Sequence, residues 1–158
     1  MTPDRLADIH AKAMQVPAPW TAKAISDLLE TPGAFLVTVS PAPVSKYPGV
    51  ARGGDAPSAA GFAMGRLAAD EAELLTLAVD PDCQRQGLGR DCLRLFEKES
   101  RAGGANRAFL EVAASNLAAR RLYHSAGYSE DGIRKNYYRA GGGKPIDAIL
   151  MSKLLNPV

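Results

Sequence analysis

The chain begins with apolar residues at helical spacing. Thr2 and Pro3 are typical of a helix start, and Leu6, Ile9 and Ala13 then recur three or four residues apart. The same criteria predict further helices after a cap at Thr21, between Leu88 and the Gly103-Gly104 pair, and between a cap at Ser115 or Asn116 and Gly127.

Runs of apolar and β-forming residues between these helices predict strands. The run ELLTLAV, residues 73–79, is apolar almost throughout, as in a strand buried on both faces. The order of strands and helices predicts one α/β domain over residues 1–158, with a mixed sheet flanked by helices. The predicted strands cover residues 35–39, 60–67, 73–79, 107–112, 133–138 and 146–154.

Residues 41–58 differ from the rest of the chain. They include four prolines and three glycines and few residues suited to a core. Because strand patterns resume directly afterwards, we expect a long flexible loop inside the domain rather than a domain boundary.

Composition narrows the class of protein. Hydrophobic residues make up 46% and charged residues 23% of the chain, and the formal net charge is +2. The basic residues are spread along the chain, so nucleic-acid binding is not expected. We expect a cytoplasmic protein without a membrane partner, because long apolar runs and a signal-peptide pattern are lacking. Cys83 and Cys92 do not indicate a disulfide framework, and nothing favours a metal site.

A glycine-containing segment, QRQGLGR, lies between a predicted strand and a predicted helix. Gly87 and Gly89 leave the backbone open to an anion, and the helix start supplies unpaired N–H groups. Arg85 and Arg90 add positive charge. On the glycines alone, an ordinary turn is an equal alternative. The segment matches neither the phosphate-binding loop of nucleoside triphosphatases nor the glycine pattern of dinucleotide-binding domains.

The segment VDPDCQRQGLGR resembles the acetyl-CoA loop of the GCN5-related N-acetyltransferase (GNAT) family, whose pattern is [Q/R]-x-x-G-x-[G/A]. Gln84, Gly87 and Gly89 occupy its defined positions. The segments LEVAASNLAARRLYHSAGY and IRKNYYRAGGGKPIDAILM, together with Pro19-Trp20, resemble the ribosomal-protein-alanine acetyltransferase group in particular. The clear resemblance covers residues 73–154.

This resemblance implies a GNAT-like domain whose central strands splay apart at an acetyl-CoA site. Free backbone groups of the splayed strand would pair with the pantetheine arm, and a backbone N–H near Val79 would hold the thioester oxygen. No metal is implied. The residues expected to bind the cofactor are Leu77, Ala78, Val79, Arg85, Gln86, Gly87, Leu88, Gly89, Arg90 and Asn116.

Two residues are candidates for proton transfer. Glu111 lies mid-strand, where an unpaired charge is costly, so either it faces a functional cleft or it points to solvent. By resemblance, Glu111 is the general base, acting through a water, and Tyr123 is the general acid for the CoA thiolate. From spacing alone Tyr123 would be a core residue. His124 as base, and an acyl-cysteine route through Cys83 or Cys92, are weaker alternatives, so direct transfer is preferred.

The resemblance predicts an enzyme that acetylates the α-amino group of an N-terminal alanine of a small-subunit ribosomal protein. Tyr137-Tyr138 and Pro19-Trp20 are candidate walls of a peptide groove, or plain structural residues. Acetylation of a lysine or a small-molecule amine is one alternative, and a non-catalytic acyl-CoA-binding module is another. The presence of both Glu111 and Tyr123 counts against the latter.

Overall fold

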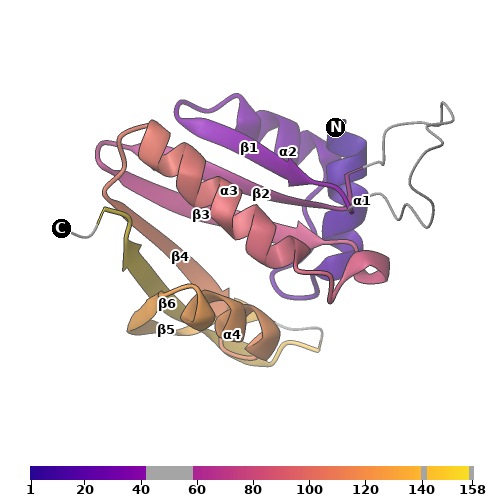
Figure 1. Cartoon of the computed structure of the whole chain (residues 1–158). Helices are drawn as coiled ribbons and strands as arrows, with labels where there is room; N and C mark the ends of the chain where they lie inside the picture. The colour runs from indigo at the N-terminus through magenta and orange to yellow at the C-terminus, as the bar shows by residue number, and fades with distance from the viewer. Residues whose placement is uncertain (42–58, 140–141, 157–158) are drawn as a thin grey trace, which may run out of the picture.

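A computed structural model describes residues 1–41, 59–139 and 142–156. Within those residues, six strands form one mixed sheet in the order β1-β2-β3-β4-β6-β5, with helices on both faces (Figure 1). The predicted α/β fold class is confirmed, whereas residues 42–58 of the predicted loop lie outside the described residues. The elements are α1 (Pro3–Ala13), α2 (Ala22–Leu29), β1 (Ala34–Val39), β2 (Gly61–Ala68), β3 (Glu71–Val79), the 3-10 turn η1 (Pro81–Cys83), α3 (Leu88–Ala102), β4 (Arg107–Ala113), α4 (Leu117–Ser125), β5 (Ser129–Arg139) and β6 (Pro145–Leu154).

The first two helices cover one face of the sheet. As predicted, Thr2 and Thr21 cap them: their hydroxyl oxygens accept hydrogen bonds from the N–H groups of Arg5 at 3.3 Å and Ala24 at 3.1 Å. Their apolar stripes pack against β2 and β3 and form one core cluster. Its fully buried members are Leu6, Ile9, Ile25, Phe62 and Met64.

Helices α3 and α4 cover the opposite face and form the main core (Figure 1). The stripe of α3 is buried at Leu88, Cys92 and Phe96 as predicted, but Leu95 is only half-buried and Leu93 is buried instead. Tyr123 of α4 and the following Tyr128 complete this core.

Strand β3 corrects one prediction. It is not buried on both faces but alternates between buried and half-buried residues. Two of its half-buried residues, Leu75 and Leu77, pack only partly against the core clusters and also line cavities beside the strand. An apolar run alone cannot distinguish a buried face from the lining of a cavity.

The sheet opens between β3 and β4. These two strands run parallel, and their pairing extends only from Glu71↔Arg107 to Leu74↔Leu110. Beyond that point residues 75–79 of β3 and 111–113 of β4 are unpaired with each other, although β3 remains paired with β2 as far as Val79. A register shift opposite Met64/Gly65 accompanies the divergence. This opening, called the β3–β4 gap below, is the predicted splay.

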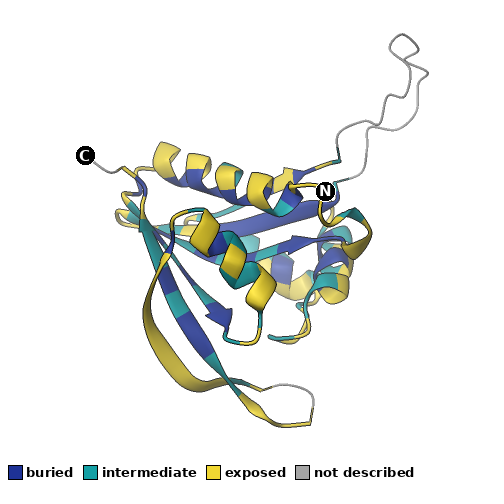
Figure 2. Cartoon of the chain, turned by 60° about the horizontal axis from the view of Figure 1, so that its bottom comes forward, coloured by how far each residue is buried: buried dark blue, intermediate teal, exposed yellow. Residues whose placement is uncertain are grey.

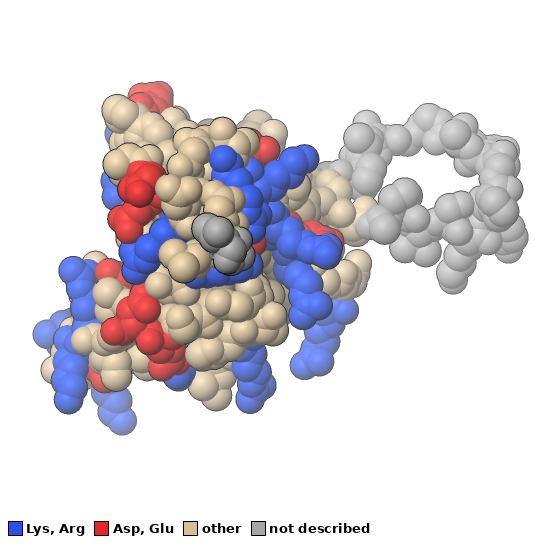
Figure 3. All heavy atoms as spheres, turned by 60° about the vertical axis from the view of Figure 1, so that its left-hand side comes forward, with Lys and Arg blue, Asp and Glu red and all other residues tan. Residues whose placement is uncertain are grey.

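The last two strands form an edge of the sheet. β5 starts at Ser129, earlier than the predicted strand, because pairing with β6 extends a segment whose Ser, Glu, Asp and Gly residues are poor β-formers. Figure 2 shows β5 exposed along nearly its whole length. At the end of the sheet away from the glycine segment, acidic and basic side chains intermingle (Figure 3), and Arg107 pairs there with Glu71 at 2.8 Å and Asp131 at 3.2 Å.

Candidate active site

The glycine turn before α3 has the geometry of an anion seat. Gly87 caps the helix with a φ of 80°, a left-handed conformation that favours glycine. A Cβ at Gly87 would meet no atom of the described residues within 4 Å, so the space beside the turn is open. The first amides of α3 have no intrahelical acceptors, and the helix dipole places positive potential there.

A larger cavity of about 470 Å³ lies beside this turn, bounded by β3, α3, α4 and the end of α1. It is large enough for a substantial part of an extended cofactor, and it brings together segments that the sequence analysis had grouped only by resemblance. Gln86 does not line it. The predicted cofactor-binding residues that do are Leu77, Ala78, Val79, Arg85, Gly87, Leu88, Gly89, Arg90 and Asn116.

Two contacts hold the lining of the larger cavity. The Gln84 side-chain amide donates a hydrogen bond to the Val79 carbonyl at 3.4 Å, which ties the turn back to the end of β3. Gln84 was part of the sequence motif but was not predicted as a lining residue. The Asn116 side chain accepts from the Ala119 N–H at 3.2 Å, so its capping role is present.

A smaller cavity, of about 70 Å³, occupies the β3–β4 gap. Its lining shares residues with the larger cavity, so the two are contiguous. It contains both candidates for proton transfer, Glu111 and Tyr123, together with Trp20 and Tyr138 from the predicted peptide groove. The residues shared by both cavities are Met14, Leu77, Asn116, Ala119 and Tyr123.

Glu111 lies on the sheet face opposite to that of its buried neighbours Leu110 and Val112. Its carboxylate is neither buried and unpaired nor free in solvent: the side chain is 27% exposed and accepts from Arg134 Nη1 at 3.0 and 3.3 Å. Arg134 in turn lies over the ring of Tyr137, 4.7 Å from its centroid. Sequence analysis did not single out Arg134, because the pairing depends on the register of β5 across β6.

Tyr123 reaches the gap from the face that carries α3 and α4. Its ring packs against Tyr128 with centroids 5.9 Å apart. Burial, and then the neighbouring Tyr138, raise the pKa of Tyr123 well above its ordinary value. Burial and the Glu111 carboxylate raise the pKa of Tyr138 to about 12. Both phenols are therefore protonated at physiological pH, as an ordinary tyrosine also is.

A buried histidine supports the acceptor side of the gap. The His10 Nδ1 accepts a hydrogen bond from the backbone N–H of Trp20 at 3.2 Å, while Nε2 lies 3.1 Å from the Thr76 hydroxyl. The ring stacks on Trp20 with centroids 5.1 Å apart, and burial lowers the pKa of His10. Trp20 and Thr76 both line the smaller cavity. His10 was not among the predicted site residues, since its partners are distant in sequence.

The family model described as Acetyltransferase (GNAT) family matches residues 10–128. The chain belongs to this family. It is 48% identical over 93 residues to the [Ribosomal protein bS18]-alanine N-acetyltransferase of Escherichia coli (strain K12). This match covers 59% of this chain and 62% of the length of that relative. It is 33% identical over 139 residues to the N-alpha-acetyltransferase RimI of Mycobacterium tuberculosis, covering 87% of this chain and 79% of that protein.

The fold agrees with this family membership. The crystal structure of the ribosomal-protein-S18-alanine N-acetyltransferase from Escherichia coli superposes with a TM-score of 0.78 at 33% identity, covering 99% of this chain and 89% of that one. The predicted resemblance to the GNAT family, and to the ribosomal-protein-alanine acetyltransferase group within it, is thereby confirmed.

The geometry of this GNAT domain argues against His124 as the base and against Cys83 or Cys92 as a nucleophile. His124 is outside both cavities and lies 3.3 Å from Glu130 at the surface. Cys92 is fully buried, and burial followed by Asp91 raises the pKa of its thiol to about 12, so the reactive thiolate is not available. Neither Cys83 nor Cys92 lines either of the two cavities described above.

Within residues 1–41, 59–139 and 142–156, no group of His, Cys, Asp or Glu side chains is arranged to hold a metal ion. None of the helices in the described ranges has the length and apolar character to span a bilayer.

Proposed function

We propose that this chain is an acetyl-CoA-dependent N-acetyltransferase that moves the acetyl group directly to the α-amino group of an N-terminal alanine. The observation that carries the proposal is the junction of the two cavities in the β3–β4 gap, with Glu111 and Tyr123 on its opposite faces. The Escherichia coli relative, named for alanine of ribosomal protein bS18, supports a small-subunit ribosomal protein as the acceptor.

The larger cavity suits acetyl-CoA. Its glycine turn and the N-terminus of α3 would take the pyrophosphate, with Arg85 and Arg90 adding charge. Residues 77–79 line the same cavity on the side of β3 that is no longer paired with β4, so backbone groups there, other than the Val79 carbonyl that accepts from Gln84, could bind an extended arm. When bound, acetyl-CoA supplies the acetyl group as a thioester.

Glu111 is the proposed base. An amine must lose its proton before it can attack, and a free α-amino group has a pKa of about 8, against about 10.4 for lysine. A carboxylate beside the smaller cavity therefore suffices, acting through a water, for an N-terminus near neutral pH. Arg134 fixes the carboxylate that would do this.

Tyr123 is the proposed acid. Its phenol is protonated in the working pH range, and its place in both cavities puts it where acetyl donor and acceptor would meet. Its proton would go to the departing thiolate. Direct transfer is supported by the cavity linings, which contain no cysteine among the described residues.

A panel of acceptors tests the proposal. We expect a peptide with a free N-terminal alanine to be acetylated at least tenfold faster than the same peptide with a blocked N-terminus and an internal lysine, and faster than a polyamine. Preference for either of the other two would establish the alternative acceptor class. Binding of acetyl-CoA without turnover on any amine would indicate a non-catalytic module and overturn the proposal.

A further inference from the structure

Asp80 is a buried carboxylate outside both cavities. It follows Val79 directly at the end of β3, and its side chain is 7% exposed. Its Oδ1 accepts from the Asp82 N–H at 3.2 Å, which caps η1, and its own N–H donates to the Ala60 carbonyl at 2.7 Å. The residue thus fixes the point at which the strand becomes the loop that leads to the glycine turn.

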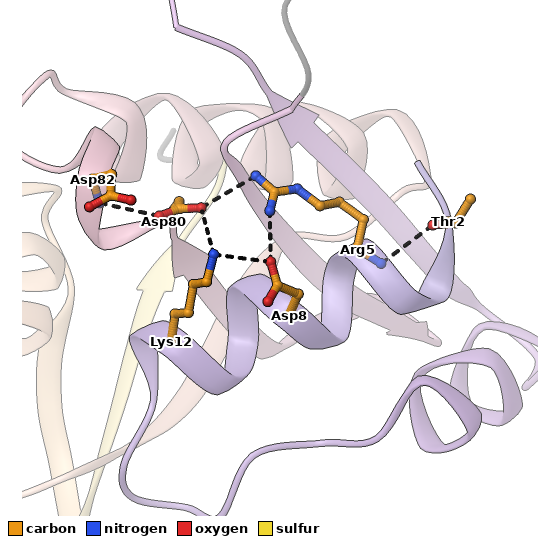
Figure 4. A network of polar contacts seen from close by, with 6 residues as sticks. All are labelled: Thr2, Arg5, Asp8, Lys12, Asp80 and Asp82. Carbon is orange, nitrogen blue, oxygen red and sulfur yellow. Dashed lines mark hydrogen bonds and ion pairs between the residues drawn. The ribbon is translucent and has the colours of Figure 1, made fainter.

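The charge of Asp80 is balanced from another element. Oδ2 lies 3.3 Å from Arg5 Nη2 and 3.9 Å from Lys12 Nζ, and both cations come from one face of α1 (Figure 4). The same two cations contact the exposed Asp8, at 2.7 and 3.2 Å. Because a buried charge is costly unless it is paired, the pairing draws α1 and the end of β3 together.

The two joined elements are opposite borders of the larger cavity. Ala13 and Met14 follow Lys12 at the end of α1 and line that cavity, while Leu77 to Val79 precede Asp80 and line it from β3. A shift of α1 relative to β3 would therefore change the space between Met14 and Leu77. Asp80 also lies four residues before Gln84, close in sequence to the anion seat, where an unbalanced carboxylate would repel phosphates.

We propose that Asp80 is a positioning residue for acetyl-CoA, acting through Arg5 and Lys12 without touching the ligand. It holds α1 against the end of β3, which sets the width of the larger cavity. The two cations neutralise Asp80, so that the anion seat remains attractive to phosphate. The inference rests on the proposed function, because it assumes that the larger cavity takes acetyl-CoA.

The test is the dissociation constant of CoA, measured by calorimetry on the full chain with folding verified by thermal melting. We expect Asp80→Asn to raise it about tenfold. The double variant Arg5→Met/Lys12→Met should raise it further, because the carboxylate then remains without its cations. Adding Asp80→Asn to that double variant should lower the dissociation constant again, toward the value of Asp80→Asn alone. A contact that acts on stability alone would show this recovery in the melting temperature, but would leave the dissociation constant of CoA unchanged in all the folded variants.

Two control variants separate positioning from general destabilisation. Asp8→Asn removes the exposed acid that touches the same cations. Glu97→Gln breaks a comparable buried ion group with Lys153 and Arg101, remote from both cavity linings. We expect both to bind CoA within about twofold of wild type, even if Glu97→Gln melts at a lower temperature.

The outcomes distinguish the two levels of inference. If wild-type protein does not bind CoA, the proposed function fails and this inference fails with it. If wild type binds but folded Asp80→Asn and the double variant bind CoA within twofold of it, only the positioning role is overturned. If Asp80→Asn does not fold, Lys12→Met decides, since it removes a half-exposed cation: a rise of about threefold supports the role, and an unchanged dissociation constant rejects it.

Discussion

One side of the β3–β4 gap is continuous in sequence, whereas the other is assembled from distant segments. The cofactor wall consists mainly of β3, the glycine turn and the start of α3, all within residues 71–102, while α4 and the end of α1 complete the larger cavity. The acceptor wall consists of the α1–α2 connection, β4 and β5. It depends on side-chain contacts such as Glu111 with Arg134 and His10 with Trp20.

This difference separates the expected effects of substitutions. Changes on the cofactor wall should alter the affinity for CoA, because the seat is made by main chain and dipole. Changes on the acceptor wall should alter kcat or the KM for the peptide and leave CoA affinity unchanged. Asp80 and its cations are the exception, since they join α1 to the cofactor wall.

The largest effect is expected for Glu111→Gln, which keeps the shape and removes the base. kcat/KM for an alanine-terminated peptide should fall about 10²–10⁴-fold at neutral pH, and part of the loss should return above about pH 8, where the α-amine deprotonates unaided. CoA affinity should be unchanged. Glu73→Gln is the matched control, an acid of β3 paired with Arg66 at 2.7 Å outside both cavities. Full activity of Glu111→Gln would reject the role.

Tyr123→Phe should lower kcat by about 10²–10³-fold, because the phenolic proton is removed while the ring remains. In contrast to Glu111→Gln, a higher pH should not restore activity, since the missing proton is the one for the thiolate. Tyr128→Phe is the control: Tyr128 packs against Tyr123 but lines neither cavity. The measurement is kcat from pH 6 to 9.5, and parallel pH profiles for Glu111→Gln and Tyr123→Phe would contradict the assignment of base and acid.

The contrast between the walls also explains how much the sequence could predict. The cofactor wall follows from local signals: an apolar strand, glycines with the required spacing and an amphipathic helix. Accordingly, the predicted limits of this strand and helix lie close to the observed ones. All the predicted cofactor-binding residues except Gln86 line the larger cavity. The resemblance supplied what spacing alone left open, namely the placement of Glu111 and Tyr123 at one cavity.

The acceptor wall was predicted less completely because its contacts depend on tertiary register. Arg134 reaches Glu111 across β6, and His10 reaches Thr76 over 66 positions of sequence. No local pattern encodes these distances. Similarly, the early start of β5 follows from pairing with β6, and the incomplete burial of Leu75 and Leu77 depends on the cavities that β3 lines. The limits of the predicted loop at 41–58 and the single domain over 1–158 stay predictions.

A third experiment tests the cofactor wall with a matched pair of glycines. Gly87→Asp should raise the dissociation constant of CoA about 100-fold, roughly 2.7 kcal/mol, through strain at positive φ and repulsion of phosphate. Gly104→Asp at the far end of α3 is the control. It has a φ of 91° and the same open surroundings among the described residues, but lines no cavity. Equal CoA affinities of the two folded variants would show that the glycine turn before α3 does not bind the phosphates of CoA.

The smallest effect is expected at His10, and it tests whether the acceptor wall is held by side chains. His10→Phe keeps a ring against Trp20 but leaves the Trp20 N–H and the Thr76 hydroxyl without their partner. The KM for the peptide should rise about three- to tenfold and the dissociation constant of CoA should stay constant. The free energy of unfolding should fall by about 1–3 kcal/mol, the cost of buried polar groups left unpaired.

The pH dependence of stability adds an independent measurement on His10. Burial lowers the pKa of the folded-state imidazole below its ordinary value of 6.5, so below that pH the unfolded chain binds more protons than the folded one. The stabilising effect of the neutral ring is therefore complete above about pH 6.5 and declines as the pH falls toward the folded-state pKa. Thermal melts from pH 7.5 to 5 should show this decline in wild type and a smaller one in His10→Phe.

Thr76→Val, which removes one of the two hydrogen bonds and keeps the imidazole, should retain the wild-type slope. Equal slopes in wild type and His10→Phe, or an equal rise in the CoA dissociation constant and the peptide KM, would show that His10 does not support the acceptor wall selectively.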